Sequence, residues 1–322
     1  TVLTIEMITQ AAERLKDVAI QTPLLESPLL NNALGFRLLI KPECLQKTGS
    51  FKIRGAYNKI ASLDETQRKA GVVAYSSGNH AQGVAAAASA MGVAAKIVMP
   101  SDAPRIKLDN TAHWGGEVIT YDRQAGDRAE IARNIAEKTG ATLVPPYDDY
   151  HLMAGQGTAG LEIAEQLDAL GIQADRVICP VGGGGLIAGV STAMLASQAE
   201  TEIWAAEPCN FDDTKRSLEA RTALSIEPGH SSICDSIVTA RPGRLTFPIN
   251  LKTLSGGYSV NEPDVVTAMR VLFTELKVVA EPGGAVSVAA AWSNKEAFQG
   301  QTIVALVSGG NVDMDSFLGW MI

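Results

Sequence analysis

A lysine in an apolar setting is the first residue whose type and position suit chemistry. Lys52 lies between Phe51 and Ile53 in the segment TGSFKIRGA, with Arg54 two residues further on. Most single lysines are solvated surface groups, and that interpretation holds for Lys52 if nothing else supports a role. Apolar neighbours and a nearby cation lower the pKa of a lysine amine, as a Schiff-base lysine requires. Lys52 is therefore a candidate nucleophile toward a carbonyl compound.

The motif PVGGGGLIAG is a candidate phosphate site. It lies between an expected strand, RVICPV, and a helix expected to begin near Leu186. Its four consecutive glycines are Gly182, Gly183, Gly184 and Gly185. Backbone amides without side chains can converge on one anion, and the positive end of the helix dipole adds to that attraction.

Two other interpretations apply to the same motif. Gly183, Gly185 and Ala188 approximate the fingerprint of dinucleotide-binding folds, and Glu207 ends the next expected strand, as a ribose-binding acid would. On this motif alone, the phosphate of a small cofactor and the pyrophosphate of NAD are closely matched. A merely structural turn is the third interpretation, although four glycines cost more backbone entropy than one turn requires.

Polar residues follow another expected strand in the segment AYSSGNHAQG. Ser76, Ser77 and Asn79 are common helix-capping residues, and capping is the ordinary role of each. The amide groups of this loop could also receive a substrate carboxylate at the helix N-terminus, and the Asn79 amide could bind a ring hydroxyl. For His80, a structural role is expected rather than that of a base.

A third polar loop begins at Ser308, in the segment VALVSGGNVD. Serine before two glycines is usually a turn residue, but its hydroxyl could meet a pyridine nitrogen. In open α/β sheets, ligands lie beyond the carboxyl ends of strands. The three polar loops are therefore candidates for one shared site.

Short β-branched runs alternate with helical stretches from about residue 70 onward, as in GVVAYSS followed by HAQGVAAAASAMG. This alternation predicts an α/β protein with parallel sheets and right-handed crossovers. Residues 65–148 are expected to form a small lobe, and residues 1–64 and 149–322 a large one. The segment VPPYDDYHLMAGQGT (144–158) is expected to be the loop that closes the small lobe.

Composition argues against several classes of partner. The chain has 322 residues and a net charge of −8 with no cluster of Lys or Arg, which disfavours nucleic acid and anionic membrane surfaces. No apolar stretch approaches the ~20 residues that span a bilayer, and the N-terminal segment lacks the pattern of a signal peptide. The four cysteines are widely spaced without a CxxC pair, which favours reduced thiols. A cytoplasmic enzyme is the expected class.

Six motifs together resemble a known family. SFKIRGA, SSGNHAQG, PVGGGGLIAG, AAEPxNxDD, EPGGAV and SGGNVD occur in this order over nearly the whole chain. The set is similar to the serine racemase and threonine/serine dehydratase family, of fold type II among the pyridoxal-phosphate enzymes. The resemblance implies two open twisted sheets with helices on both faces, a large and a small lobe, and pyridoxal 5′-phosphate as cofactor. It disfavours NAD, because a dinucleotide enzyme does not need the lysine and serine segments.

The resemblance also implies roles for the candidate residues. Lys52 holds the cofactor as a Schiff base and removes the α-proton, Asn79 binds the ring hydroxyl, and Ser308 faces the pyridine nitrogen. The cofactor-binding residues that it implies are Phe51, Lys52, Asn79, Gly182, Gly183, Gly184, Gly185, Leu186 and Ser308. Ser77 matches the position that acts as acid or base on the opposite face in the racemases.

The substrate side is implied in the same way. Its residues are Ser76, Ser77, Gly78, Asn79, His80, Arg128, Asp235 and Ser236. Arg128 resembles a small-lobe arginine that swings toward the active site in racemase-like members; an exposed helix arginine is an equally good interpretation. Asp235 and Ser236 match a loop where the family commonly has Asp-Gly, and the serine narrows that loop or adds a hydroxyl.

Glu207 and Asp213, with the backbone carbonyl of Phe211, align with the divalent-cation ligands of the family. These are hard oxygen donors, as Mg²⁺, Ca²⁺ or Mn²⁺ prefers. An acidic loop without a metal is the alternative. A bound cation would order this loop near the phosphate site.

The resemblance implies elimination of the β-hydroxyl from a small amino acid, L-threonine or L-serine, to give a 2-oxo acid and ammonia. Serine racemase activity and dehydration of 3-hydroxyaspartate are the open alternatives, and an NAD-binding protein is the alternative from another class. Members of the family commonly form dimers, so a homodimer is expected.

Overall fold

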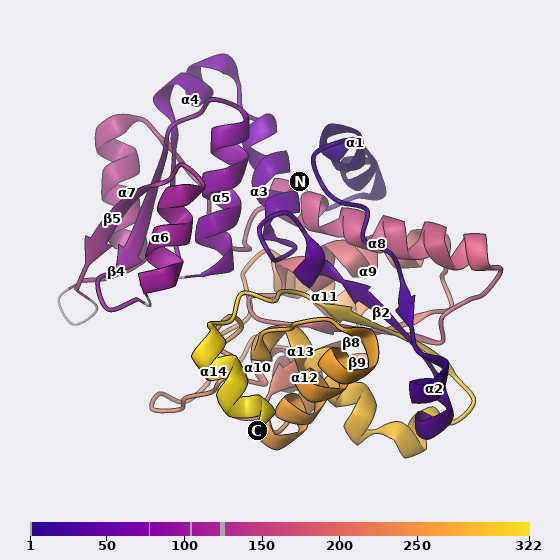
Figure 1. The fold of residues 1–322 in the computed structure, drawn as a ribbon. Coiled ribbons are helices and arrows are strands. Elements are labelled where there is room, and N and C mark those ends of the chain that lie inside the picture. The colour runs from indigo at the N-terminus through magenta and orange to yellow at the C-terminus, as the bar shows by residue number, and fades with distance from the viewer. Residues whose placement is uncertain (1, 77, 104, 123–125) are drawn as a thin grey trace.

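The chain folds into two lobes, each built on one open sheet (Figure 1). The structure is a computed structural model that describes residues 2–76, 78–103, 105–122 and 126–322. The smaller lobe carries the strands β3 to β6 and the helices α4 to α7, and most of the remaining chain forms the larger lobe (Figure 1).

The larger sheet has six strands in the order β1-β2-β10-β7-β8-β9. The strands are β1 (Leu25–Glu26), β2 (Arg37–Pro42), β7 (Arg176–Pro180), β8 (Glu202–Pro208), β9 (Gly256–Val260) and β10 (Thr302–Val307). Neighbouring strands run parallel, except that β1 pairs antiparallel with β2. Parallel neighbours need crossover connections, which the intervening helices supply.

Helices cover both faces of this sheet, and strand β10 shows how. Val304 and Leu306 pack in the core shared with α8 and α9, whereas Ala305 and Val307 pack in the core shared with α12 and α13. Successive side chains of a strand point to opposite faces, so a strand buried on both sides is continuously apolar. The expected α/β architecture, with helices on both faces, is confirmed.

The smaller sheet has four parallel strands in the order β5-β4-β3-β6. They are β3 (Val72–Tyr75), β4 (Ala95–Pro100), β5 (Glu117–Tyr121) and β6 (Thr142–Leu143). Their core is rich in alanine on the α5 side, where Ala81, Ala87 and Ala88 let the helix lie close to the sheet. All four strands fall between residues 72 and 143; the boundary at 65–148 stays a prediction.

Helix α3 (Lys52–Ala61) packs against α5 of the small lobe and α8 of the large lobe. The small-lobe helices are α4 (Glu65–Ala70), α5 (Asn79–Ala90), α6 (Arg105–His113) and α7 (Arg128–Thr139). The other α-helices are α1 (Ile5–Leu15), α2 (Pro28–Leu34), α8 (Tyr150–Leu170), α9 (Gly185–Ser197), α10 (Asp213–Ala220), α11 (Thr246–Thr253), α12 (Glu262–Leu276), α13 (Pro282–Ser293) and α14 (Met314–Met321). Two 3-10 helices, η1 (Glu43–Leu45) and η2 (Lys295–Phe298), complete the elements of the described residues. In the described part of the chain, no helix has both the length and the apolar character needed to cross a membrane.

The segment 144–158, expected as one loop, is a loop only as far as Asp149. Helix α8 begins at Tyr150, where the Asp149 carboxylate caps it by accepting hydrogen bonds from two amides of the first turn. Gly155, within this helix, is a packing residue, because a Cβ there would lie 2.5 Å from the carbonyl oxygen of Arg54. The expectation was wrong for the second half of the segment because the prolines and acidic residues that indicated a loop, Pro145 to Asp149, all precede the helix, and Asp149 is its cap.

Candidate active site

The candidate residues meet in a pocket lined by both lobes, beyond the carboxyl ends of β3, β7 and β10. This edge of an open α/β sheet collects the loops and helix N-termini that bind ligands. The predicted residues that line the pocket are Phe51, Lys52, Ser76, Gly78, Asn79, His80, Arg128, Gly182, Gly183, Gly184, Gly185, Leu186, Asp235, Ser236 and Ser308. Ser77 lies outside the described residues.

Lys52 is the first residue of α3, and its side chain lies in the pocket. Its Nζ atom donates a hydrogen bond of 2.7 Å to the Pro146 carbonyl and lies 5.2 Å from the centre of the Phe51 ring. Burial lowers the pKa of Lys52 to about 8, against the opposing attraction of the Glu281 carboxylate. The expected cause was partly wrong: burial lowers the pKa, while the charge of Arg54 is paired with carboxylates. A neutral amine able to attack a carbonyl is therefore accessible near neutral pH.

The glycine loop follows β7 and ends at the start of α9. Gly184 has a φ of +88°, in the left-handed region that glycine adopts without strain. A Cβ at Gly183 would lie 2.2 Å from the ring of Tyr147, so a larger residue would not fit. The Thr246 hydroxyl donates to the Gly183 carbonyl at 2.6 Å, and the Asn250 amide donates to the Gly184 carbonyl at 3.3 Å. With these carbonyls engaged and the first amides of α9 lacking helical partners, the loop presents N–H donors to an anion.

Asn79 begins α5 and belongs to a chain of hydrogen bonds. Its Nδ2 donates to Oε1 of Glu281 at 2.5 Å, and its Oδ1 accepts from Nδ2 of Asn311 at 2.7 Å. Burial, with the nearby Asp235 carboxylate, raises the pKa of Glu281 to about 7, and the bond from Asn79 opposes the shift. Because Nδ2 has two N–H groups, the second can donate to a ligand while the first holds Glu281.

Ser308 follows the last residue of β10 and is 4% exposed. Its carbonyl accepts a hydrogen bond of 3.1 Å from the amide of Phe51. Ser50 and Gly309 form an isolated antiparallel bridge beside this bond. These backbone contacts place the Ser308 hydroxyl in the pocket close to the segment that carries Lys52.

His80 is buried in the second position of α5. Its Nε2 lies 2.9 Å from the Val144 carbonyl, and because a carbonyl only accepts, Nε2 carries the proton. Burial, with the charge of Lys52 as second cause, lowers the pKa of His80 to about 3. The Nδ1 atom is buried without a hydrogen-bond partner among the described residues. The imidazole is thus neutral at pH 7, which fits the structural role expected for it.

The small-lobe side of the pocket contains the predicted loop and an arginine. The amide of Gly78 donates to the hydroxyl of Ser76 at 3.1 Å, which shapes the turn into α5. Arg128 begins α7, and its guanidinium carbon lies 6.0 Å from the centre of the Tyr75 ring. Arg128 is an exposed helix residue that also lines the pocket. Its position is therefore compatible with both interpretations, an exposed helix arginine and an arginine that faces the active site.

On the large-lobe side, Asp235 is engaged with the small lobe. Its carboxylate accepts a hydrogen bond of 2.6 Å from Nζ of Lys107 in α6. The neighbouring Ser236 is packed toward α13, because a Cβ at Gly283 would lie 2.2 Å from its Oγ. The Ser236 hydroxyl therefore takes the space that a side chain at position 283 would fill.

The predicted cation ligands lie outside this pocket, at the carboxyl end of β8. The Glu207 oxygens accept hydrogen bonds of 2.9 and 2.8 Å from the amides of Thr214 and Lys215 in α10. Both oxygens of Asp213 are buried without a hydrogen-bond partner among the described residues, and burial raises its pKa to about 7. Phe211 lies in the connecting loop. The described chain contains no group of three or more His, Cys, Asp or Glu side chains placed to hold a metal ion.

Several residues that line or shape the pocket were not predicted as site residues. They are Lys107, Pro146, Tyr147, Thr246 and Glu281. Glu281 had a signal, since it opens the motif EPGGAV, where an acidic residue precedes a proline and an apolar helix. The others had none, because Pro146 offers only a carbonyl and Thr246 acts on a backbone oxygen distant in sequence.

Known proteins resemble the chain in sequence and in structure. A family model described as "Pyridoxal-phosphate dependent enzyme" matches residues 15–309. L-threonine ammonia-lyase of Thermotoga maritima is 44% identical over 313 residues, covering 97% of this chain and 77% of that protein. L-threo-3-hydroxyaspartate ammonia-lyase of a Pseudomonas species is 40% identical over 310 residues, covering 96% of each. The structure of maize serine racemase is 36% identical with a TM-score of 0.92, covering 100% of this chain and 97% of that one.

These matches extend over nearly the whole length of the chain and include the strands, loops and helices that form the pocket. The dinucleotide interpretation of the glycine loop has no support in them. The chain belongs to the family of pyridoxal-phosphate dependent enzymes.

Proposed function

We propose that the enzyme removes the amine and the β-hydroxyl of a small β-hydroxy-amino acid, L-threonine or L-serine, to release a 2-oxo acid and ammonia. The observation that carries the proposal is Lys52, an amine with a pKa near 8 in one pocket with a glycine loop, an amide and a hydroxyl. The relative from Thermotoga maritima, named for its action on L-threonine, supports the same reaction class.

The residues present fit pyridoxal phosphate. The amides of Gly182 to Leu186 would bind the phosphate, since the crowding at Gly183 and the φ of Gly184 leave room only for glycine. Asn79 would donate to the ring hydroxyl, and Ser308 would face the pyridine nitrogen. When bound, the cofactor withdraws electrons from the α-carbon of the attached amine. A neutral serine hydroxyl does not hold the ring nitrogen protonated, which favours prompt loss of a β-leaving group over transamination.

Lys52 would also move the proton at the α-carbon. Its lowered pKa keeps a fraction of the amine neutral near pH 7, as a base requires. The Pro146 carbonyl, 2.7 Å away, accepts a hydrogen bond from Nζ and so orients the amine. The amides of residues 77–80, at the start of α5, would bind the substrate carboxylate at the positive end of the helix.

A second candidate substrate is 3-hydroxyaspartate. Arg128 lines the pocket, and a guanidinium group binds carboxylates in a bidentate manner. The relative from Pseudomonas is named for this substrate. The second carboxylate of 3-hydroxyaspartate would then bind Arg128. L-serine has no such carboxylate, so as a substrate it would not bind Arg128 in this way.

Racemisation of serine is the third candidate activity. Ser77, outside the described residues, would exchange a proton with the α-carbon on the face opposite Lys52. The similarity to maize serine racemase supports this candidate.

We propose a divalent cation at Glu207 and Asp213, with the Phe211 carbonyl. The supporting observation is the buried Asp213 carboxylate, whose two oxygens have no hydrogen-bond partner among the described residues and would coordinate a cation. Such a cation would order the loop between β8 and α10 and would not contact the substrate. A homodimer and a cytoplasmic location stay predictions.

The experiment is a substrate panel of L-serine, D-serine, L-threonine and 3-hydroxyaspartate, with oxo acid and enantiomer measured together. The proposal expects the highest kcat/KM for oxo acid from L-threonine or L-serine. A preference for 3-hydroxyaspartate would select the second candidate, and no oxo acid from any member would overturn the reaction class. Ser77→Ala should abolish D-serine formation and spare oxo acid if Ser77 acts on the second face.

A further inference from the structure

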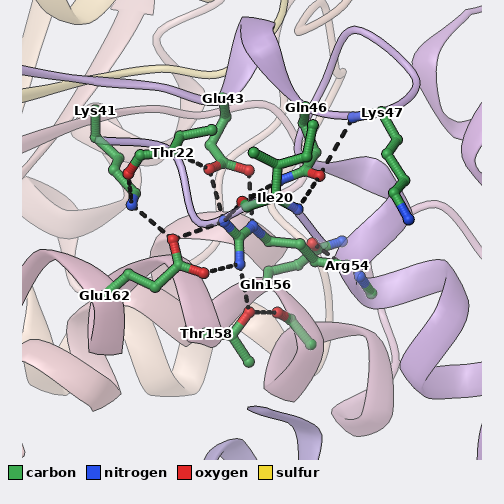
Figure 2. A network of polar contacts seen from close by, with 12 residues as sticks. Ile20, Thr22, Lys41, Glu43, Gln46, Lys47, Arg54, Gln156, Thr158 and Glu162 are labelled. Carbon is green, nitrogen blue, oxygen red and sulfur yellow. Dashed lines mark hydrogen bonds and ion pairs between the residues drawn. The ribbon is translucent and has the colours of Figure 1, made fainter. Parts of the chain in front are cut away.

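A buried group of charged residues surrounds the side chain of Arg54, which lies in the first turn of α3 (Figure 2). We name it the Arg54 network; its members are Lys41, Glu43, Arg54 and Glu162. Lys41, Glu43 and Arg54 are 0% exposed, and the Glu162 side chain is 15% exposed. In the described part of the chain, none of the four lines the active-site pocket. Two cations and two anions therefore lie inside the protein without touching the site of chemistry.

Arg54 uses its whole guanidinium group. Nε and Nη2 donate to the two oxygens of Glu43 at 2.7 and 2.8 Å. Nη1 and Nη2 donate to the two oxygens of Glu162 at 2.6 and 2.8 Å. Two facing bidentate pairs fix the plane and the position of the guanidinium, which the single ammonium of a lysine cannot do.

The partners of Arg54 come from different elements. Glu43 lies in η1, just after β2, and Glu162 lies in the middle of α8 (Figure 2). Lys41 of β2 donates to Glu162 at 2.6 Å and completes the charge balance. The network therefore ties α3 to the large sheet and to the long helix at the same point.

Arg54 and Lys52 lie on opposite faces of one helical turn. Two residues correspond to about 200° around a helix axis, so Lys52 projects into the pocket while Arg54 projects into the network. Helix α3 begins at Lys52, and the preceding Phe51 makes no side-chain capping hydrogen bond. The guanidinium thus anchors a turn that lacks the usual local cap.

Close backbone contacts hold the same turn from both sides. A Cβ at Gly83 of α5 would lie 3.0 Å from the Cβ of Lys52. A Cβ at Gly155 of α8 would lie 2.5 Å from the carbonyl oxygen of Arg54. The first turn of α3 is therefore packed closely between α5 and α8, and the two bidentate pairs fix its rotation about the helix axis.

Stability alone is a weak reason for such a network. Apolar residues of similar volume often replace a buried ion pair with no loss of stability, because they avoid the cost of desolvating charge. Apolar residues do not, however, fix the orientation of a side chain as directional hydrogen bonds do. The arrangement around Arg54 therefore suits a role in geometry.

We propose that Arg54 is a positioning residue for Lys52: its two bidentate pairs fix the first turn of α3 so that Nζ of Lys52 meets the cofactor carbonyl and the substrate α-carbon. The inference rests on the proposed role of Lys52 and concerns only how that amine is placed. A misplacement of about 1 Å at a reacting group costs ~100-fold in rate, so the loss of one bidentate pair has a measurable effect.

The test compares Arg54→Lys, which keeps the charge and loses the bidentate geometry, with Lys41→Met. The control also removes a buried cation that donates to Glu162, but from β2. Apo-protein of each variant is mixed with pyridoxal phosphate, and the rate at which visible absorption of lysine-bound cofactor develops is measured. Melting temperature, kcat and KM are measured alongside.

For Arg54→Lys we expect ~10- to 100-fold slower capture of the cofactor and a similar loss of kcat, with KM little changed. The apparent pKa of the absorbing species should shift as well. Lys41→Met should lower the melting temperature and leave capture rate and kcat within about twofold. Equal effects of the two variants on capture and kcat, or no effect of either, would overturn the inference.

Two further variants keep the outcome decisive. If Arg54→Lys does not fold, Glu43→Gln weakens one bidentate pair while leaving the Lys41 contact intact, and the same slowing is expected. Lys52→Ala, measured in parallel, separates this inference from the proposed function. Lysine-bound cofactor in Lys52→Ala would refute the role of Lys52. If Lys52→Ala forms no lysine-bound cofactor but Arg54→Lys captures the cofactor at the wild-type rate, only the role of Arg54 is refuted.

Discussion

The Asn79 amide donates a hydrogen bond of 2.5 Å to the buried carboxylate of Glu281. This bond joins the residue proposed to bind the cofactor ring hydroxyl to the carboxylate whose attraction opposes the lowered pKa of Lys52. Glu281 therefore contacts Asn79 directly and raises the pKa of Lys52 through its charge, although in the sequence it was only part of a motif.

Removing the charge of Glu281 should shift the pH dependence of cofactor capture. Burial lowers the pKa of Lys52 to about 8, and the Glu281 carboxylate raises it. The neutral amine attacks, so capture by wild-type apo-protein should rise with pH through about 8. In Glu281→Gln the opposing attraction is lost, and the rise should move to lower pH. Stopped-flow absorbance over pH 6 to 9 measures both curves; identical midpoints would contradict the coupling.

His80 should make the protein sensitive to acid. Its folded pKa of about 3 is below the unfolded value of 6.5, so the unfolded chain binds a proton that the folded chain does not. Its stabilising contribution is complete above pH 6.5 and falls as pH decreases toward 3. At pH 5 this costs about 2 kcal/mol relative to pH 7.

The variant His80→Gln removes this proton uptake. Urea unfolding at pH 7 and pH 5 should show a smaller difference in unfolding free energy for the variant than for the wild type. An equal acid loss in the two proteins would mean that His80 does not carry the effect.

The glycine loop should tolerate no side chain at Gly184. Alanine there is strained by roughly 1–2 kcal/mol because φ is +88°, and its Cβ would lie 2.6 Å from Nδ2 of Asn250. We expect Gly184→Ala to weaken pyridoxal phosphate binding at least ~10-fold, measured by absorbance titration. Gly319→Ala is the matched control, since its Cβ would meet nothing within 4 Å. Equal affinity in both variants would contradict the assignment of the loop.

Arg128 should discriminate between substrates. If it meets a second carboxylate, Arg128→Ala should raise KM for 3-hydroxyaspartate by ~10- to 100-fold and leave KM for L-serine nearly unchanged, as expected for a lost charge-assisted hydrogen bond. Arg133→Ala, on the same helix but not lining the pocket among the described residues, is the control. A parallel loss on both substrates would assign Arg128 to the structure of the lobe.

A chelator should destabilise the enzyme if the cation site is occupied in solution. Removal of the cation leaves the buried Asp213 carboxylate unpaired, so the melting temperature should fall and Mg²⁺ should restore it. Asp213→Ala should be indifferent to chelator. If the melting temperature of the wild type also does not respond to chelator, and elemental analysis finds no bound metal, the loop between β8 and α10 is ordered without a cation.

Much of the fold and of the site follows from local patterns. Strand β10 is continuously apolar because it is buried on both faces, and Lys52, Asn79, the glycine loop and Ser308 lie in motifs that end strands or begin helices. Such features can be predicted from the sequence because each depends on residues that are close together in the chain.

Contacts between segments distant in sequence were not visible in this way. The prolines and polar residues of the 144–158 segment predict a loop, whereas the helix that begins at Tyr150 is packed through Gly155 against Arg54 of another helix. Likewise, Arg54 was expected to lower the pKa of Lys52, and only the fold shows that two carboxylates neutralise it. The pairing of Lys107 with Asp235 depends on how the lobes meet, which no local pattern records.

The most direct test of the account is the visible absorption of Lys52→Ala. Lys59→Ala is its control, since Lys59 lies on the same helix and pairs with Asp149. With added pyridoxal phosphate, the wild type and the control should show the absorption of lysine-bound cofactor, whereas Lys52→Ala should not and should form no oxo acid. Lysine-bound cofactor and oxo-acid production in Lys52→Ala would contradict the account.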